Sequence, residues 1–251
     1  MSTLAISSIV FAVVFAGALL GMFLSKVLPQ NHLSDDSKSV VMIAMGLVAT
    51  MTALVLGLLI SSAKGSFDAQ SSEIMVTSSN IILLDEILAN YGPETKEARD
   101  LLRSAVAKVI DQMELKQRAD PTHLAVSTRE MESLRDKIQG LSPKDDRQRS
   151  FQTEALSILK ELRQARWLIY EQRTSSISMP MLIILVSWLT ALFISFGLYA
   201  PANGTVVISL LVSALSVSCA IFLILELYTP YRGLIKISSA TLNAALAQLG
   251  K

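Results

Sequence analysis

Four apolar runs, each of about 20 residues or more, constrain this chain more than any other feature. An α-helix rises 1.5 Å per residue, so a run of this length crosses a hydrocarbon core of roughly 30 Å. Hydrophobic residues make up 51% of the 251 positions, and the mean hydropathy is +0.49, values typical of an integral membrane protein. We predict four transmembrane helices, over residues 4–24, 40–61, 179–199 and 206–227.

The distribution of basic residues predicts the orientation of these spans. All but five of the 22 Lys and Arg residues lie between the second and third runs, in residues 64–176. The turn between the third and fourth runs, residues 200–205, has none. The positive-inside tendency therefore predicts that both termini and the long segment are cytoplasmic. The first run lacks a basic n-region and is too long for a signal-peptide core, so we interpret it as a retained span.

Helical periodicity predicts a bundle in the long segment. Apolar residues continue at helical spacing beyond the second span as far as Tyr91, where Gly92 and Pro93 end the helix. A second helix is expected from Pro93 and a third from the capping box at residues 127–130. Ser142 and Pro143 are expected to cap a fourth, which returns toward Pro180, where the helix should break or kink.

The predicted fold is therefore all-α, with a cytoplasmic helical bundle inserted between spans two and three. Its predicted parts are residues 1–63 with spans one and two, 64–176 with the bundle, 177–228 with spans three and four, and 229–251 as a cytoplasmic amphipathic tail. Because four helices enclose no aqueous passage by themselves, any channel requires a homo-oligomer.

Catalytic, metal-binding and nucleic-acid-binding chemistry find little support in the sequence. The net charge of +1 argues against a nucleic-acid partner, and the one cysteine, Cys219, forms no disulfide frame. A Ser-x-x-Lys pattern occurs at Ser61–Lys64 without the companion motifs of the enzymes that use it. His32 is interpreted as a solvated turn residue. We expect no enzyme activity, no metal site and no cofactor.

A stripe of small and polar residues follows one face of the second span. Such a stripe favours close approach of another helix, or it lines a water-filled axis between several copies, with the lysine attracting anions at its cytoplasmic mouth. The sequence leaves both interpretations open. The candidate pore-lining residues are Gly46, Thr50, Ala53, Gly57, Ser61 and Lys64.

Further residues are candidates for packing and for a charge pair at the membrane edge. The spacing of Gly17 and Gly21 in span one is that of a small-xxx-small packing motif. Glu226, at the end of span four, needs a partner near the membrane edge, and the candidates are Arg232, Lys64 and the N-terminus of the tail helix. A second small face, on span four, is formed by Ser209, Ser213 and Ser216.

Several of these stretches resemble the bestrophin-like family of bacterial membrane proteins, which is distantly similar to the bestrophin anion channels. The resemblance covers nearly the whole chain. It is carried by HLSDDSK from His32, GLVATMTALVLGLLISSAKGSFD from Gly46, LDEILANYGPE from Leu84, WLTALFISFGL from Trp188, and the end of the chain from Ile221.

The resemblance implies an oligomeric, anion-conducting channel with span two lining the pore. The chain departs from bestrophins in two places: its candidate pore face is small rather than bulky, and Pro230-Tyr231 is not followed by an acidic calcium-binding cluster. We expect an ion channel in the lipid bilayer. The alternative is a membrane-anchored sensor or scaffold whose cytoplasmic bundle docks a protein partner.

Overall fold

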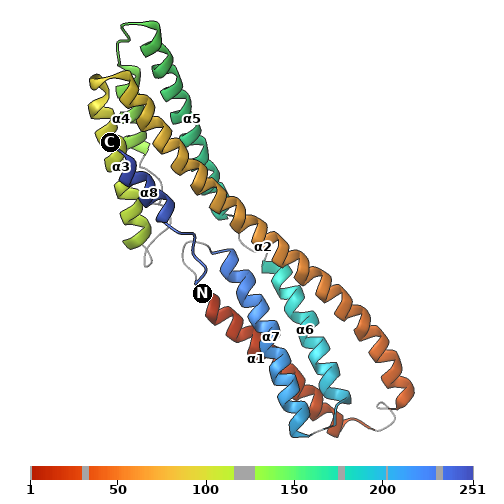
Figure 1. Cartoon of the computed structure of the whole chain (residues 1–251). Helices are drawn as coiled ribbons and strands as arrows, with labels where there is room; N and C mark the ends of the chain where they lie inside the picture. Colours follow the sequence, from red (N-terminus) through yellow and green to blue (C-terminus); the bar gives the residue numbers. More distant parts are fainter. Residues whose placement is uncertain are drawn as a thin grey trace. The chain divides into compact units, whose positions relative to one another are not determined.

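The computed structural model describes residues 2–29, 34–115, 128–174, 179–201, 203–229 and 234–250 (Figure 1). Within these ranges every regular element is a helix, as predicted. Four of the helices, α1, α2, α6 and α7, are long and apolar enough to cross a membrane, which confirms the predicted number of candidate spans. The helices are α1 (Thr3–Val27), α2 (Asp35–Tyr91), the 3-10 helix η2 (Pro93–Thr95), α3 (Lys96–Leu115), α4 (Thr128–Gln139), α5 (Asp146–Thr174), α6 (Met179–Tyr199), α7 (Gly204–Leu227) and α8 (Ala240–Gln248).

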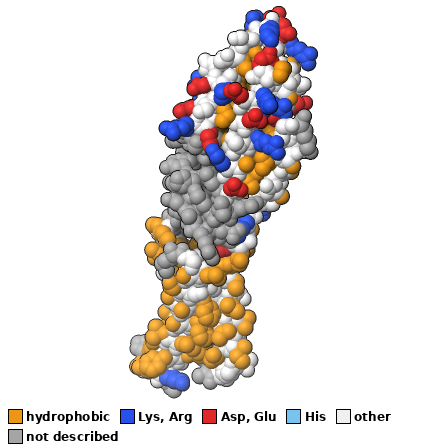
Figure 2. Space-filling model, turned by 90° about the vertical axis from the view of Figure 1, so that its left-hand side faces the viewer, with side chains coloured by type: hydrophobic (Ala, Val, Ile, Leu, Met, Phe, Trp, Pro, Cys, Tyr) orange, Lys and Arg blue, Asp and Glu red, His pale blue; other side chains and the backbone are white. Residues whose placement is uncertain are grey.

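The chain divides into two compact units. Unit 1 comprises Met1–Phe67 and Ser176–Ile235, and unit 2 comprises Asp68–Ser175 and Lys236–Lys251. Helix α2 runs without a break from the first unit into the second, because apolar periodicity continues beyond the apolar run. Hydrophobic side chains dominate the surface formed by the apolar helices, whereas the surface of the other unit carries interspersed Lys, Arg, Asp and Glu (Figure 2).

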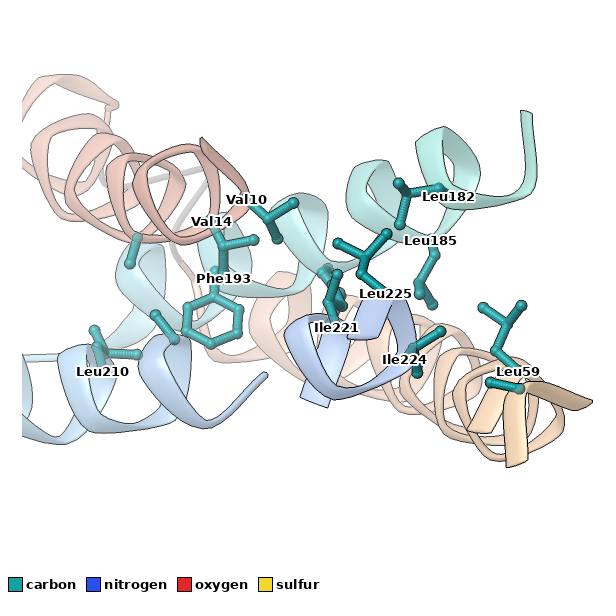
Figure 3. Close-up of a cluster of buried hydrophobic side chains, with 14 of the residues drawn as sticks. Val10, Val14, Leu59, Leu182, Leu185, Phe193, Leu210, Ile221, Ile224 and Leu225 are labelled. Atoms are coloured by element: carbon teal, nitrogen blue, oxygen red, sulfur yellow. The ribbon is translucent and has the colours of Figure 1, made fainter. Parts of the chain in front are cut away.

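The core of unit 1 lies between α1, α6 and α7. Helix α1 packs along both α6 and α7. Val14 of α1, Leu185 of α6 and Ala214 of α7 are fully buried, and the close-up in Figure 3 shows side chains from these helices meeting in one cluster. Since unpaired polar groups are costly in such a core, the buried Ser218 hydroxyl donates to the Ser7 carbonyl, 2.6 Å away.

Helix α2 joins this core by one narrow strip of its surface. Leu59 and Ala63 are buried in the cluster, and Thr52 is buried about two turns before Leu59. Further toward the start of α2 the side chains are uncovered, with Ile43 76% exposed. Most of the apolar surface of α2 within unit 1 is therefore exposed in the described part of the chain.

Unit 2 begins where α2 turns into α3. Helix α2 ends at Tyr91, as predicted, because Gly92 takes a left-handed φ of +136° that favours glycine. The buried Thr95 hydroxyl lies 2.5 Å from the Leu88 carbonyl and 2.7 Å from the Gly92 carbonyl. It is therefore within hydrogen-bond distance of two backbone acceptors at the end of α2. A 3-10 turn from Pro93 to Thr95 precedes α3.

The remaining helices of unit 2 bury a core that includes Leu84, Val106, Ile138 and Leu159. Helix α4 contacts both α3 and α5, and α8 packs on α3. The Gln152 side-chain amide donates to the carbonyls of Ile138 and Leu141, at 2.9 and 3.0 Å, and so satisfies acceptors where α4 ends.

The start of α5 differs from the prediction. The helix begins at Asp146 rather than directly after Ser142 and Pro143. The reason is that the Asp145 carboxylate accepts the Gln148 backbone N–H at 2.7 Å, which caps the first turn from a later residue. Residue 127 of the predicted capping box and residues 175–178 before Pro180 lie outside the described residues.

Candidate functional site

The six stripe residues of α2 all lie on the exposed surface of unit 1. A Cβ atom added at Gly46 or Gly57 would meet nothing within 4 Å. The Thr50 hydroxyl donates to the Gly46 carbonyl one turn earlier, at 2.9 Å, and still has lone pairs for a further donor. Together with Ala53, Ser61 and Lys64, these residues form a smooth face, here called the α2 stripe.

The α2 stripe lies on the side of the helix away from the residues that pack on unit 1. At 3.6 residues per turn, its mean direction is roughly 140° around the helix from that of Thr52, Leu59 and Ala63. Large apolar side chains occupy the adjoining sector, and all of them are exposed: Leu47, Met51, Leu54 and Leu58. Helix α2 thus presents a small polar face and a large apolar face, side by side.

Lys64 lies at the end of the α2 stripe. Its ammonium is 5.7 Å from the centroid of the Phe67 ring one turn later, a cation–π geometry. On a neighbouring part of the same helix, the Tyr228 hydroxyl after α7 is 3.2 Å from the Ser62 hydroxyl. Within unit 1, the Tyr228 hydroxyl therefore links the residue after α7 to the last turns of the apolar part of α2.

Glu226 is 2% exposed in the last turn of α7. Its Oε1 accepts the Thr3 hydroxyl at 2.6 Å, and its Oε2 accepts the backbone N–H of Leu234. The carboxylate also supplies negative charge beside the first turn of α1, which has no acid of its own. Arg232, one predicted partner, lies outside the described residues.

The Gly17 and Gly21 face of α1 lies against α6. A Cβ at Gly21 would overlap the Ile194 carbonyl and stand 2.9 Å from the Leu198 nitrogen, and one at Gly17 would lie 3.1 Å from the Thr190 methyl. Gly197 of α6 approaches the Ala18 carbonyl in the same way. Glycines on both helices therefore bring the two backbones together.

The serines of α7 occupy a different environment. Ser209, Ser213 and Ser216 are exposed, and the Ser216 hydroxyl donates to the Val212 carbonyl of its own helix at 2.9 Å. The buried face of α7 runs through Leu210, Ala214, Ser218 and Ile221.

One polar cluster in unit 2 was missed by the sequence analysis. Asp85 is 6% exposed in α2, and Arg99 of α3 donates to both of its oxygens, Nε to Oδ1 at 2.7 Å and Nη2 to Oδ2 at 2.8 Å. The backbone N–H of Gly250 also donates to Oδ2, at 3.1 Å. The available signal was an acid on the apolar face of α2, between Leu84 and Leu88.

Electrostatics at Asp85 favour its charged form. Burial raises the pKa of the Asp85 carboxyl, but the hydrogen bonds from Arg99 and Gly250 and the charge of Arg103 lower it more, so that the pKa lies below its usual value. The Arg99 pKa is raised by its hydrogen bonds to Asp85. In the described residues, no group of three or more His, Cys, Asp or Glu side chains could hold a metal ion.

The fold and its uncovered apolar helices are those of an all-helical, membrane-compatible protein. The model of the bestrophin-like domain matches residues 12–242, and the chain belongs to the bestrophin-like family. A crystal structure of a bacterial bestrophin homologue from Klebsiella pneumoniae, carrying one mutation, has a similar fold, with a TM-score of 0.68 over 96% of each chain at 14% identity. No curated protein matches the sequence significantly.

Proposed function

We propose that this chain is one subunit of an oligomeric ion channel, in which α2 of each copy lines the conduction path. The observation that carries the proposal is the α2 stripe, which the protomer leaves uncovered while its neighbouring faces are apolar. An uncovered helix face with hydroxyls and no large side chains suits a wet passage, and the adjoining face of Leu47, Met51 and Leu54 suits contact with a neighbouring copy or lipid.

The proposed permeating ion is an anion. Lys64 is the one charged member of the α2 stripe, and copies of it around an axis would concentrate anions at one mouth of the passage. Family membership and the similar fold of the Klebsiella homologue support a channel over an enzyme.

The proposed location is the inner membrane of a bacterium, with both termini and unit 2 in the cytoplasm. This orientation rests on the excess of Lys and Arg in residues 64–176 and on their absence from residues 200–205. It places Lys64 at the cytoplasmic mouth.

The experiment is thiol block of the current in reconstituted bilayers. In a Cys219→Ser background, a cysteine replaces Thr50 on the α2 stripe or, as a matched control, Leu54 on the adjoining apolar face. A charged, water-soluble thiol reagent should block most of the current of Thr50→Cys, because an aqueous path is where a thiolate forms and reacts. Leu54→Cys should keep its current.

Two outcomes contradict the proposal. If Thr50→Cys assembles and conducts but resists the reagent, α2 does not line the path. If the assembled protein carries no current under any ionic gradient, the chain is not a channel, and the membrane-anchored docking protein becomes the better description.

A further inference from the structure

Two carboxylates are buried in the described part of the chain, Glu226 in unit 1 and Asp85 in unit 2. A buried carboxylate is costly unless hydrogen bonds and positive charge compensate it. Both receive a backbone N–H from the same part of the sequence, the segment that follows α7. The two buried carboxylates therefore contact the backbone of one segment at two separate residues.

At the first of these points, Glu226 accepts the backbone N–H of Leu234. The Leu234 side chain is 79% exposed, so the backbone, not the side chain, is what this contact holds. The next residue, Ile235, packs against the core of unit 1. The chain after α7 is therefore fixed at residues 234 and 235.

At the second point, Asp85 accepts the N–H of Gly250. Gly250 has a left-handed φ of +87°, and a Cβ there would lie 3.3 Å from Arg103 Nη1. Arg99 holds Asp85 from the other side with two hydrogen bonds. A fixed carboxylate thus faces the last described residue of the chain.

Between the two points lies α8, which depends on its surroundings. A helix of nine residues is unstable alone in water, because so short a helix does not recover the cost of nucleation. Helix α8 packs on α3 and buries Leu242 and Ala245, followed by Leu249. Because this apolar contact is small, the hydrogen bond from Gly250 to Asp85 contributes a large share of the free energy that docks α8.

We propose that residues 234–250 form a releasable strap, here called the C-terminal strap, whose two ends are held by hydrogen bonds to the side chains of Glu226 and Asp85. Loss of the hold at Asp85 releases α8 and exposes the part of α3 that it covers. Each contact lies within its own unit, and the inference needs neither conduction nor the proposed function.

The two carboxylates respond differently to neutral amide substitutes. In Asp85→Asn, the new NH2 group must face a donor, because both oxygens of Asp85 accept from Arg99 or Gly250. In Glu226→Gln, the amide oxygen can accept from Leu234 while the NH2 donates to the Thr3 hydroxyl, which can also accept. Glu226→Leu retains neither bond. The pair Gln and Leu at position 226 is therefore a matched comparison.

The test is hydrogen–deuterium exchange of the full-length protein in detergent, read separately for residues 234–239, 240–250 and α3. Asp85→Asn should speed exchange in residues 240–250 by about tenfold to a hundredfold, the range expected for a hydrogen bond to a charged group. Glu86→Gln, an exposed neighbour, should leave it unchanged. Glu226→Leu should speed exchange in residues 234–239, and Glu226→Gln should not.

A second variant covers the case in which Asp85→Asn unfolds unit 2, seen as equal loss of protection in α3. Gly250→Pro removes the N–H donor and, because proline fixes φ at about −65°, also the left-handed turn, while Asp85 and Arg99 keep their side chains. Faster exchange of α8 alone in Gly250→Pro supports the strap. Unchanged α8 protection in Gly250→Pro overturns it, as does unchanged exchange of residues 234–239 in Glu226→Leu.

Discussion

At the residue scale, α1 and α6 pack closely because glycines at their contact have no Cβ atom. Gly21 and Gly197 have no side chain, and each faces a backbone carbonyl of the opposite helix. Backbone cannot move aside as a flexible side chain can, so any Cβ at these positions forces the helices apart. Gly65 of α2 has the opposite environment, with nothing within 4 Å of an added Cβ.

Gly21→Leu should therefore destabilise unit 1 by about 3 kcal/mol or more, since overpacking against backbone leaves no room for repacking. Gly65→Leu, the matched control, meets no neighbouring atom and should raise stability by up to about 1 kcal/mol, because leucine is a better helix former than glycine. Thermal unfolding in detergent, followed by circular dichroism, measures both. Equal unfolding temperatures for the two variants would show that α1 and α6 do not meet at Gly21.

The sequence alone predicted the α1 side of this contact but not the helix that packs against it. The four-residue spacing of Gly17 and Gly21 indicates a face that another helix can approach. It does not indicate which helix, and Gly197 carries no spacing signal of its own in α6. The partner is decided by how α1, α6 and α7 pack together, which is long-range information.

At the element scale, Asp85 joins three parts of unit 2: α2, α3 and the end of the chain. Apolar periodicity predicted α2 as far as Tyr91, and the structure confirms this end. Periodicity treats Asp85 as an interruption of the apolar face, because the residue that neutralises it, Arg99, lies across a turn. Buried ion pairs of this kind are found only once helices are placed side by side.

The pH dependence of unit 2 follows from this ion pair. The folded pKa of Asp85 lies below its unfolded value of about 3.9, so its contribution is present above that value and is lost as the pH falls through the folded pKa. At pH 7, Asp85→Asn should lower the free energy of unfolding by roughly 2 kcal/mol.

The difference between wild type and Asp85→Asn should shrink as the pH falls from about 4 through the lower folded pKa of Asp85, below which the folded wild-type carboxyl is also neutral. Arg99 and Arg103 are the basic residues that act on Asp85, and Asp100 is the other acid near Arg99. Denaturant unfolding at pH 7 and at acid pH measures the difference, with Glu86→Gln as the control. A difference that is the same at both pH values would mean that the charge of Asp85 is not what stabilises unit 2.

At the scale of the whole molecule, the sequence predicts which helices are candidate membrane spans. The structure of one chain adds which faces of these helices pack on one another within that chain. Four apolar runs of sufficient length identify the candidate spans, and the family match agrees with the resemblance. Neither of them predicts what covers the α2 stripe, because in the proposed channel the deciding contacts lie between copies of the chain. Exposure of Thr50 and Gly57 in one protomer is compatible with an aqueous axis and requires a measurement on the assembly.

That measurement is the reversal potential of Lys64→Glu in planar bilayers under a salt gradient. Two unit charges about 10 Å apart interact by roughly 1.7 kcal/mol at an effective dielectric of 20, enough to change a local ion concentration several-fold. If Lys64 borders the path, Lys64→Glu shifts the reversal potential toward the cation equilibrium potential, while Lys26→Glu, at the exposed end of α1, leaves it unchanged. Identical reversal potentials for Lys64→Glu and wild type would contradict a conduction path along α2.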